Sequence, residues 1–550
     1  MKNRAYILYI FIVCGLFACQ KNFLEKEAQD TIPEGDVFEN IDLTNLFVNN
    51  MYLDVPYYWG PVDPTGLYDN IADESRSFWD WGESNVLYGQ WNAAVNPMEY
   101  WPYAAIRKTN MFLDAIDKTT FLEDEKSTLK GQVKVLRAKL YFDLAKRYGG
   151  VPLIISAQSL QDSLLVSRQT LDSTLGFIIR ELEEAANLLP ESYKSIDEDV
   201  SRWNKNSVKA FLGRVLLYNA SPLYNESGDN SRWAYAAEVN RQVIESGAYS
   251  LHPSFRRIML DKNNSEEVFS VQFRYGFREH SYDSDAQPDD RSNGWAVARS
   301  PLQEFVDAFE MSNGKAISDP SSGYDPNNPY ENRDPRFKQI VITNGDEFGV
   351  HGGGISGTKP VWMYEGREET GVGNPYSTVT GYLLRKGVNE ENSRFAGWSG
   401  SEQNWQELRY AEVLLNYAEA QNEFSGPDAS VYNAVEQIRL RAGLIPHQLP
   451  AGLTKEQMRE KIHNERYIEL SFENKRYWDL RRWKVATEVL NGKRYNGMFI
   501  QQENDETPLT AYEERPVDPE PIVFQEKMYF MPIPQREIEK NPNLEQNPGW

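Results

Sequence analysis

The sequence predicts a mainly α-helical protein in which helical repeats form a scaffold and an irregular, loop-rich lobe carries short strands. Three observations support this fold class. A helix within residues 131–152 has two apolar faces, its pattern of small residues recurs in later helices, and the helical period is lost from residue 251 to about residue 399. Repeated helix pairs with small residues at their contacts are typical of a tetratricopeptide-like stack.

The helix within residues 131–152 is the element around which the chain is organised. Two apolar faces indicate that neighbours pack on both sides, and the alanines allow those neighbours to approach closely. Gly149 and Gly150 can adopt the left-handed cap conformation and Pro152 prevents continuation, so the helix ends there. The two faces are spaced by three or four residues and consist of Val133, Leu136, Leu140 and Leu144, and of Ala138, Tyr141, Ala145 and Tyr148.

The same periodicity predicts the other helices of the scaffold. The segments at 207–220 and 408–420 repeat the small-residue pattern of the central helix, and Thr454 with Gln457 forms a capping-box pair. Between them, the stretch VFSVQFRYGF alternates like a strand. The predicted helices lie at residues 42–52, 104–116, 126–148, 170–189, 206–220, 232–246, 405–424, 430–442 and 454–472.

The N-terminus has the pattern of a bacterial lipoprotein leader. Lys2 and Arg4 precede an apolar run at 6–17 that is too short to span a bilayer, and the run ends in the lipobox-like sequence LFAC. We therefore expect cleavage before Cys19 and lipid on its sulfur, which would hold a soluble body to a membrane. The alternative is a plain secreted protein with an incidental cysteine.

These patterns divide one structural unit into consecutive segments. The leader is followed by a polar tether, and the scaffold is interrupted by long loops rich in Tyr, Trp, Gly, Pro and Asp, of the kind that usually carry function. We expect the irregular C-terminal segment to pack on the scaffold. The predicted segments are a signal peptide at 1–18, a lipidated tether at 19–40, scaffold at 41–250 with ligand-binding loops at 55–102, the irregular lobe at 251–400, scaffold again at 401–483, and the C-terminal segment at 484–550.

Composition excludes several classes of function. A formal net charge of -23 argues against nucleic acid and anionic membranes as partners. Because both cysteines lie before residue 20, the folded part has no thiolate metal site and no cysteine nucleophile. The histidines lie far apart and none is in an H-E-x-x-H motif, and pairs of carboxylates are inevitable in so acidic a chain. We therefore expect no catalytic residues, no cofactor and no catalytic metal.

Three other constellations have a plain structural interpretation. The glycine-rich stretch at 352–357 formally satisfies G-x-G-x-x-G, but Pro360 prevents the helix that would hold a pyrophosphate, so a flexible or ligand-adjacent loop is expected. Alternating charges at 465–482 favour an ion-pair network with Trp478 and Trp483 packed beneath it. An acidic loop and a structural calcium site are both compatible with Asp283, Asp285, Asp289 and Asp290.

Aromatic residues in loops are the informative set for binding. The apolar face of a pyranose ring stacks on an aromatic side chain, while Asp, Asn and Arg bind the hydroxyl groups. Trp79 and Trp81 share a face of an extended chain, just after Asp73 and Arg76. The irregular lobe adds Tyr275, Trp295 and Trp362. The seven residues are therefore candidates for ligand binding, and the alternative for each aromatic is packing in the core.

Several motifs, in order along nearly the whole mature chain, resemble those of the SusD/RagB family of outer-membrane lipoproteins. They are FLE at 23–25, KGQVKVLRAKLYFDLAKRYGGVPL, RDPRF at 333–337, AEA at 418–420, IRLRAGL at 438–444, NERYIELSFENKRYWDLRRW at 464–483, MPIP and the terminal QNPGW.

The resemblance implies a tetratricopeptide-like scaffold with an irregular lobe, displayed at the cell surface of the outer membrane. It implies a nutrient-binding protein, usually for oligosaccharides, that sits as a lid on a TonB-dependent transporter of the SusC type. The RagB branch implies peptide as the alternative ligand, and a glycoside hydrolase is a further alternative. Glycan binding without catalysis is the function we expect, with Cys19 as the lipid anchor.

Overall fold

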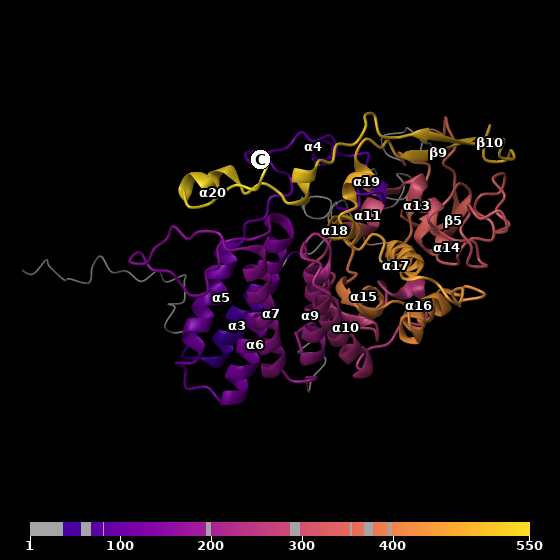
Figure 1. The fold of residues 1–550 in the computed structure, drawn as a ribbon. Helices are drawn as coiled ribbons and strands as arrows, with labels where there is room; N and C mark the ends of the chain where they lie inside the picture. The colour runs from indigo at the N-terminus through magenta and orange to yellow at the C-terminus, as the bar shows by residue number, and fades with distance from the viewer. Residues whose placement is uncertain are drawn as a thin grey trace, which may run out of the picture.

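The structure is a computed structural model that describes residues 37–54, 56, 68–80, 82–193, 200–286, 298–352, 355–367, 378–392, 394 and 399–550. Long helices stand side by side and form the scaffold (Figure 1). They are α3 (Ile41–Tyr52), α5 (Tyr103–Ile116), α6 (Glu123–Tyr148), α7 (Leu171–Leu188), α9 (Lys205–Ala220), α10 (Asn230–Glu245), α15 (Tyr410–Ser425), α16 (Ala429–Ala442) and α17 (Lys455–Glu469).

The central helix α6 is buried from Leu129 to its end, apart from a partly exposed Lys130, and α5 and α7 pack against it. Both predicted apolar faces are buried, which confirms the prediction of a helix packed on two sides. The predicted stop is also confirmed, because Gly149 takes a φ of 74° at the C-cap. Gly150 is needed for a different reason: a Cβ there would lie 2.0 Å from the carbonyl oxygen of Gln169.

Most predicted helices are confirmed to within a few residues, together with their caps. Thr170 Oγ1 accepts a hydrogen bond from the Ser173 N–H at the start of α7, and Thr454 forms the expected capping box with Gln457. The start of the predicted helix 405–424 is wrong. Residues Trp405–Arg409 form strand β8, because they pair antiparallel with β2 (Glu267–Val271), and α15 begins only after them.

Outside the long scaffold helices, the chain forms short helices and two-stranded antiparallel sheets, most of them in the irregular lobe and the C-terminal segment. The helices are α4 (Glu83–Leu87), η1 (Phe255–Arg257), α11 (Tyr282–Ala286), α13 (Gln303–Asp307), α14 (Phe337–Ile340), α18 (Arg476–Arg482), α19 (Ala486–Leu490), η2 (Glu526–Tyr529) and α20 (Gln535–Lys540). Besides β2–β8, the paired strands are β1 (Ser75–Arg76) with β3 (Ser300–Pro301), β4 (Val341–Ile342) with β7 (Leu383–Leu384), β5 (Asp346–Gly352) with β6 (Ile355–Val361), and β9 (Asn496–Gln501) with β10 (Ala511–Pro516).

Two of these sheets correct expectations drawn from the sequence. The glycine-rich stretch at 352–357 was expected to be a flexible or ligand-adjacent loop. Gly352 and residues 355–357 instead lie in the strands of the β5–β6 hairpin, where His351 pairs with Ser356 and Gly352 with Ile355. The segment at 492–526 is not irregular throughout, because it contains the six-residue strands of the β9–β10 hairpin. In both cases strand pairing stabilises a sequence whose polar and glycine content obscured the strand pattern.

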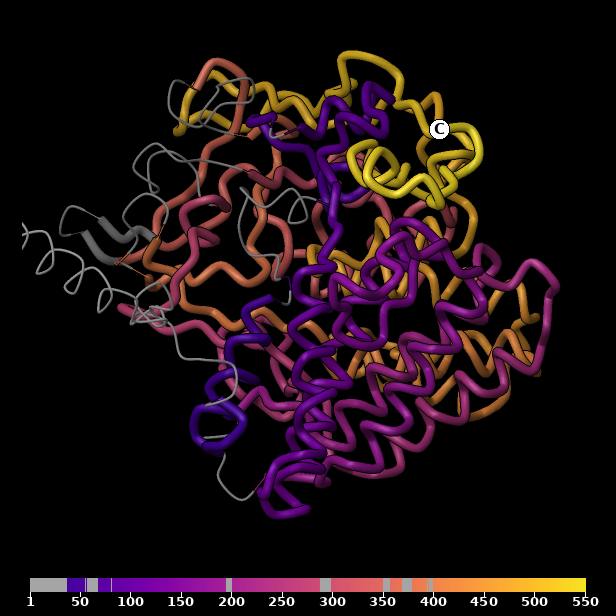
Figure 2. The backbone as a smooth tube through the Cα atoms, turned by 90° about the vertical axis from the view of Figure 1, so that its left-hand side faces the viewer, coloured from indigo at the N-terminus to yellow at the C-terminus, as the bar shows by residue number. Residues whose placement is uncertain are grey.

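The C-terminal segment lies across one end of the scaffold, beside the loops that precede α5 (Figures 1 and 2). Backbone hydrogen bonds join the two regions: the Val523 N–H donates to the Leu87 carbonyl at 2.8 Å and the Gln535 N–H to the Ala93 carbonyl at 2.8 Å. The Met531 N–H bonds the Arg147 carbonyl at the end of α6. Among the described residues, no helix combines the length and apolar character that crossing a membrane requires.

The alternating charges at 465–482 form a buried ion-pair network, which confirms their structural interpretation. Glu469 contacts three arginines: Arg336 at 3.0 Å, Arg409 at 2.7 Å, and Arg441. Burial alone would raise the pKa of this carboxyl, but Arg441 and Arg409 hold it well below its usual range. Most partners lie on other elements rather than one helical turn away, so the network joins α17 and α18 to the lobe. Trp478 and Trp483 are buried beside it.

Candidate functional site

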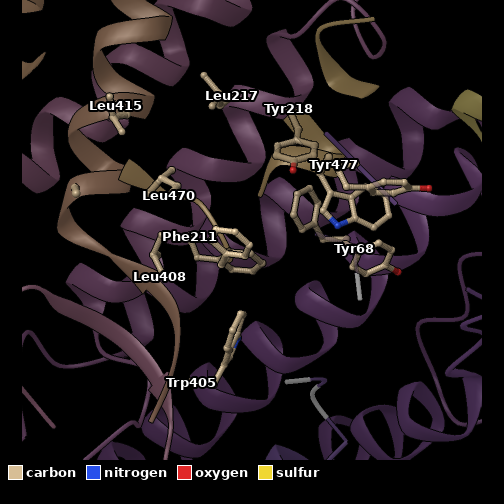
Figure 3. Close-up of a cluster of buried hydrophobic side chains, with 14 of the residues drawn as sticks. Tyr68, Phe211, Leu217, Tyr218, Trp405, Leu408, Leu415, Leu470 and Tyr477 are labelled. Carbon is tan, nitrogen blue, oxygen red and sulfur yellow. The ribbon is translucent and has the colours of Figure 1, made fainter. Parts of the chain in front are cut away.

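The chain before Trp79 is anchored in the aromatic core at Tyr68. Tyr68 is fully buried, its ring centroid lies 4.9 Å from that of Tyr477 and 5.1 Å from that of Trp478, and its hydroxyl accepts a 2.8 Å hydrogen bond from Arg147 Nη2. Figure 3 shows Tyr68, Tyr218 and Tyr477 gathered at one end of the buried cluster. Tyr68 is therefore fixed by the scaffold itself.

Asp73 and Arg76 are both buried and both use their charged groups inside the protein. Asp73 accepts hydrogen bonds from Arg476 Nε at 2.9 Å and Nη2 at 2.7 Å. Arg76 donates to both carboxylate oxygens of Asp518, at 2.7 and 3.2 Å, and its Nη1 donates to three backbone carbonyls. The two side chains thus hold the loop in place, and they are exposed by only 5% and 6%.

Trp79 is half-buried at the outer part of the same loop. Its ring centroid lies 5.4 Å from that of Phe78, edge to face at 87°, and Phe78 is 38% exposed. The turn after it is fixed by Asp80, whose Oδ1 accepts from the N–H groups of Gly82 and Ser84. Trp79 and Phe78 thus form an aromatic pair at the surface. Sequence reasoning missed Phe78, although its place beside Trp79 was a signal. Trp81 lies outside the described residues.

Tyr275 lies in a tight turn beyond β2 and is 46% exposed. The Arg394 guanidinium carbon lies 4.6 Å from its ring centroid, and the Tyr275 N–H donates to Glu402 at 3.3 Å. Glu402 is partly buried, but hydrogen bonds from Lys262 and Arg394 bring its pKa down to about 2, so it stays ionised at neutral pH. The ring is therefore held beside a fixed ion-pair cluster.

Phe277 in the same turn is 81% exposed and was missed by sequence reasoning. The turn is closed by two hydrogen bonds between the backbones of Arg274 and Arg278, and the Arg274 guanidinium lies 4.8 Å from the Phe277 ring centroid. The signal in the sequence was Gly276, which takes a φ of 79° between the two aromatic residues.

Trp362 follows β6 and is half-buried. It packs on Gly345, where an added Cβ would lie 3.1 Å from the indole ring. The predicted residues therefore lie in three separate regions: Asp73, Arg76 and Trp79 on one loop, Tyr275 in the turn beyond β2, and Trp362 after β6. Trp295 and Cys19 lie outside the described residues.

A concavity of about 290 Å³ lies next to the Tyr275 turn. Arg278 and Gln272 line it on one side, and Asn49 and Tyr52 of α3 on another. A neighbouring concavity of about 230 Å³ shares Arg202, Phe269 and Ser270 with it. The turn with the two exposed aromatic rings thus stands beside hollows lined by polar side chains, an arrangement that suits a hydroxylated ligand.

The carboxylates considered for calcium have protein partners. Asp283 is fully buried and accepts hydrogen bonds from the Asn389 N–H, Asn392 Nδ2 and Gln403 Nε2 at 2.5–2.8 Å. Burial raises the pKa of Asp285 to about 7, and Ser281 Oγ donates to it at 2.5 Å. Asp289 and Asp290 lie outside the described residues. Within the part of the chain that the structure describes, no group of three or more His, Cys, Asp or Glu side chains could hold a metal ion.

Two models of known protein families together match most of the chain. The family model described as "SusD family" matches residues 255–550, and one described as "Starch-binding associating with outer membrane" matches residues 22–217. SusD-like protein P2 of Formosa agariphila is 24% identical, covering 99% of each chain.

Solved structures have the same fold. A SusD-like protein from Bacteroides fragilis is 28% identical and superposes with a TM-score of 0.78, covering 94% of this chain and 98% of its own. A SusD-like carbohydrate-binding protein from the same species is 22% identical, with a TM-score of 0.79 and coverage of 92% and 99%. A laminarin-binding SusD-like protein is 20% identical, with a TM-score of 0.64 and coverage of 93% and 100%.

Proposed function

Because this chain belongs to the SusD family, we propose that it is a cell-surface lipoprotein that captures oligosaccharides at the outer membrane. It delivers them to a TonB-dependent transporter of the SusC type on which it sits. The family model named for starch binding and for association with the outer membrane supports both the ligand class and the location. The lipobox-like sequence before Cys19 supports the lipid anchor.

The observation that carries the glycan assignment is the turn at Tyr275. A half-exposed ring beside the Arg394 guanidinium, next to a polar concavity, offers both a stacking surface and donors for hydroxyl groups. Trp79 with Phe78 offers a second stacking surface on a loop held by buried ion pairs. By analogy with base stacking, each platform contributes roughly 1–3 kcal/mol. Two platforms therefore contribute about 2–6 kcal/mol, which corresponds to dissociation constants from tens of millimolar to tens of micromolar.

Peptide binding is the alternative within the same kind of complex. A peptide would rely on backbone hydrogen bonds at a strand edge more than on aromatic platforms. The two-stranded sheets offer such edges, for example in the β9–β10 hairpin of the C-terminal segment. We also propose that the protein is not an enzyme, because buried acids of the scaffold such as Glu469 and Glu473 are paired with arginines rather than directed at a site.

Affinity electrophoresis in gels containing laminarin, starch or xylan tests the proposal. We expect retardation of the purified protein by at least one glycan, and a loss of about tenfold or more in affinity in Trp79→Ala or Tyr275→Ala. Tyr235→Ala is the matched control, because Tyr235 is also exposed but lies on α10 of the scaffold. Unchanged retardation in both variants would overturn the aromatic-platform assignment.

Further measurements separate the alternatives. Binding of a peptide digest, measured by calorimetry, without retardation by any glycan would favour the peptide-binding function. Release of reducing sugar by the pure protein would overturn the assignment as a non-enzyme. Co-purification of a TonB-dependent transporter with the protein from outer membranes, which we expect, tests the partner.

A further inference from the structure

A large concavity lies on the helical scaffold. The elements that line it carry neither Trp79 nor Tyr275, the candidate ligand contacts of the surface loops. Its volume is about 730 Å³, within the range of small-molecule sites. The connection between α9 and α10, the C-terminal half of α15, the face of α17 and the residues after α18 line it. The side chains that matter for its chemistry are Trp233, Trp483, His463, Arg459, Glu226 and Lys484.

One wall of the concavity is aromatic and fixed. The rings of His463 and Trp483 stack with centroids 3.6 Å apart and an interplanar angle of 16°. Trp483 Nε1 donates to Glu419 Oε1 at 2.8 Å, so the indole cannot rotate without losing that bond. Burial lowers the pKa of His463 to about 3, and the imidazole is therefore neutral at pH 7. Trp233, half-buried on α10, adds a third ring to the lining.

The lining also contains polar side chains, and one of them is held in place by an ion pair. Arg459 donates from Nε and Nη2 to the two carboxylate oxygens of Glu423, both at 2.6 Å. This fork fixes the plane of the guanidinium, and the bonds formed among the described residues leave its Nη1 donors for a ligand. Glu226 adds an exposed carboxylate from the α9–α10 connection.

The backbone at the rim is in a conformation that L-residues rarely adopt. Lys484 has a φ of 62°, directly after Trp483, and its ammonium group is paired with Glu526 at 3.2 Å. Such conformations cost free energy and are concentrated at binding sites. Here the conformation lets the chain turn after α18 so that Trp483, Lys484 and Val485 all line the concavity.

The charge pattern favours a neutral ligand. Glu419 is paired with Arg482, Glu423 with Arg459, and Lys484 with Glu526. A charged ligand would therefore meet groups whose charge is already compensated, with Glu226 as the exception. A ligand with many hydroxyl groups, in contrast, can use the remaining lone pairs and N–H groups of these pairs.

We propose that this concavity is a second saccharide site, one that takes a neutral oligosaccharide of two or three sugar units. Trp233 supplies the stacking surface, Arg459 Nη1 donates to ligand hydroxyls, and Glu226 accepts from them. The proposal takes its ligand class from the proposed function but not its location, because none of the lining residues belongs to the loops that carry Trp79 or Tyr275.

Calorimetric titration of the purified full chain with maltotriose, cellotriose, laminaritriose and xylotriose tests the proposal. We expect at least one trisaccharide to bind with an affinity that falls tenfold or more in Trp233→Ala and several-fold in Arg459→Gln. Trp233→Phe keeps a ring and retains part of the affinity. Tyr235→Ala is the matched control, because it removes an exposed aromatic ring from the same helix outside the concavity. Far-UV circular dichroism confirms that each variant is folded.

The outcomes separate this site from the surface loops. Binding that is lost in Trp233→Ala but kept in Trp79→Ala and Tyr275→Ala supports the second site, even if the proposed loop site fails. Identical isotherms for wild type and Trp233→Ala with every trisaccharide overturn it, whatever the loop variants do. The second site is also overturned if the wild type binds none of the four trisaccharides at about 10 mM, a concentration that would detect even millimolar affinity. Binding that occurs only at the loops overturns it as well.

Discussion

Asp73 and Arg476 lie 403 residues apart in the chain and form a bidentate ion pair, with oxygen–nitrogen distances of 2.9 and 2.7 Å. The Arg476 guanidinium also lies 3.9 Å from the ring centroid of Tyr467, whose hydroxyl donates to the Asp73 carbonyl at 2.5 Å. The loop that presents Trp79 is thus clamped to α17 and α18. Because the clamp is buried, its geometry is coupled to the folding of the whole scaffold.

Asp73→Asn tests this clamp. The amide keeps one acceptor but removes the charge that compensates the mostly buried Arg476, so we expect a loss of about 3 kcal/mol in the free energy of unfolding. Urea unfolding followed by tryptophan fluorescence measures it. Asp54→Asn is the control, since the Asp54–Lys108 pair is partly exposed, and it should cost less than about 1 kcal/mol. Equal unfolding midpoints for Asp73→Asn and wild type would contradict the clamp.

Acid should destabilise the scaffold through its buried carboxylates. Although burial alone would raise it, Arg482 brings the pKa of Glu419 down to about 2. A depressed pKa contributes stability that is present above the unfolded value near 4.5 and is lost as pH falls toward 2. We expect Glu419→Gln to cost about 3 kcal/mol at pH 7 and to flatten the decline between about pH 4.5 and 2. Urea unfolding at a series of pH values measures both effects.

The control for this prediction is Glu245→Gln, because the exposed pair of Glu245 with Arg241 should contribute little to stability. A Glu419→Gln variant with the same acid dependence as wild type would show that Glu419 is not one of the responsible groups.

Asp285 should act in the opposite direction. Burial raises its pKa to about 7, so the folded protein holds a proton that the unfolded chain releases near pH 4. A raised carboxyl pKa makes stability fall as pH rises from about 4 to 7, by on the order of 4 kcal/mol for this group. Asp285→Asn removes the titration, and we expect the difference in unfolding free energy between pH 5 and pH 8 to shrink. An unchanged difference would contradict the prediction, and Asp172→Asn, at an exposed carboxyl on α7, is the control.

Local patterns predicted the scaffold well because helices depend on near neighbours in the sequence. The cap at Thr454 and the stop at Gly149 involve residues within one turn of the helix end, and the apolar faces of α6 are marked by a spacing of three or four residues. Strand β8 was missed because its partner β2 lies more than one hundred residues earlier, and pairing with it overrides the helical pattern that begins at 405.

The candidate site was predicted less completely for the same reason. Asp73 and Arg76 follow the pattern of polar ligand contacts in a loop, yet each forms an ion pair with a residue from the last part of the chain, Arg476 and Asp518. A local sequence cannot distinguish a side chain that faces a ligand from one that faces a distant counter-ion. Tyr275 could be identified because it stands beside Gly276, and the turn at this glycine exposes the neighbouring side chains. Phe277, on the other side of Gly276, could have been found by the same reasoning.

Gly150 provides the sharpest test of how the central helix is joined to α7. A Cβ at this position would lie 2.0 Å from the Gln169 carbonyl oxygen and 2.9 Å from the Thr170 carbonyl carbon, both backbone atoms that cannot move aside alone. The same segment is held by hydrogen bonds from the Gln169 N–H to Val151 and from Arg168 Nε to the Gly150 carbonyl. Gly150→Ala must therefore displace the connection before α7, and we expect a loss of about 3 kcal/mol or more.

The matched control for Gly150→Ala is Gly247→Ala, because Gly247 has a φ of 65° but nothing lies within 4 Å of an added Cβ. That substitution should cost only the strain of the left-handed conformation, about 1 kcal/mol. Thermal and urea unfolding of the two variants, compared with wild type, separate a steric clash from backbone strain. If Gly150→Ala proves no more destabilising than Gly247→Ala, the close approach between the end of α6 and residues 169–170 is not a constraint on the fold.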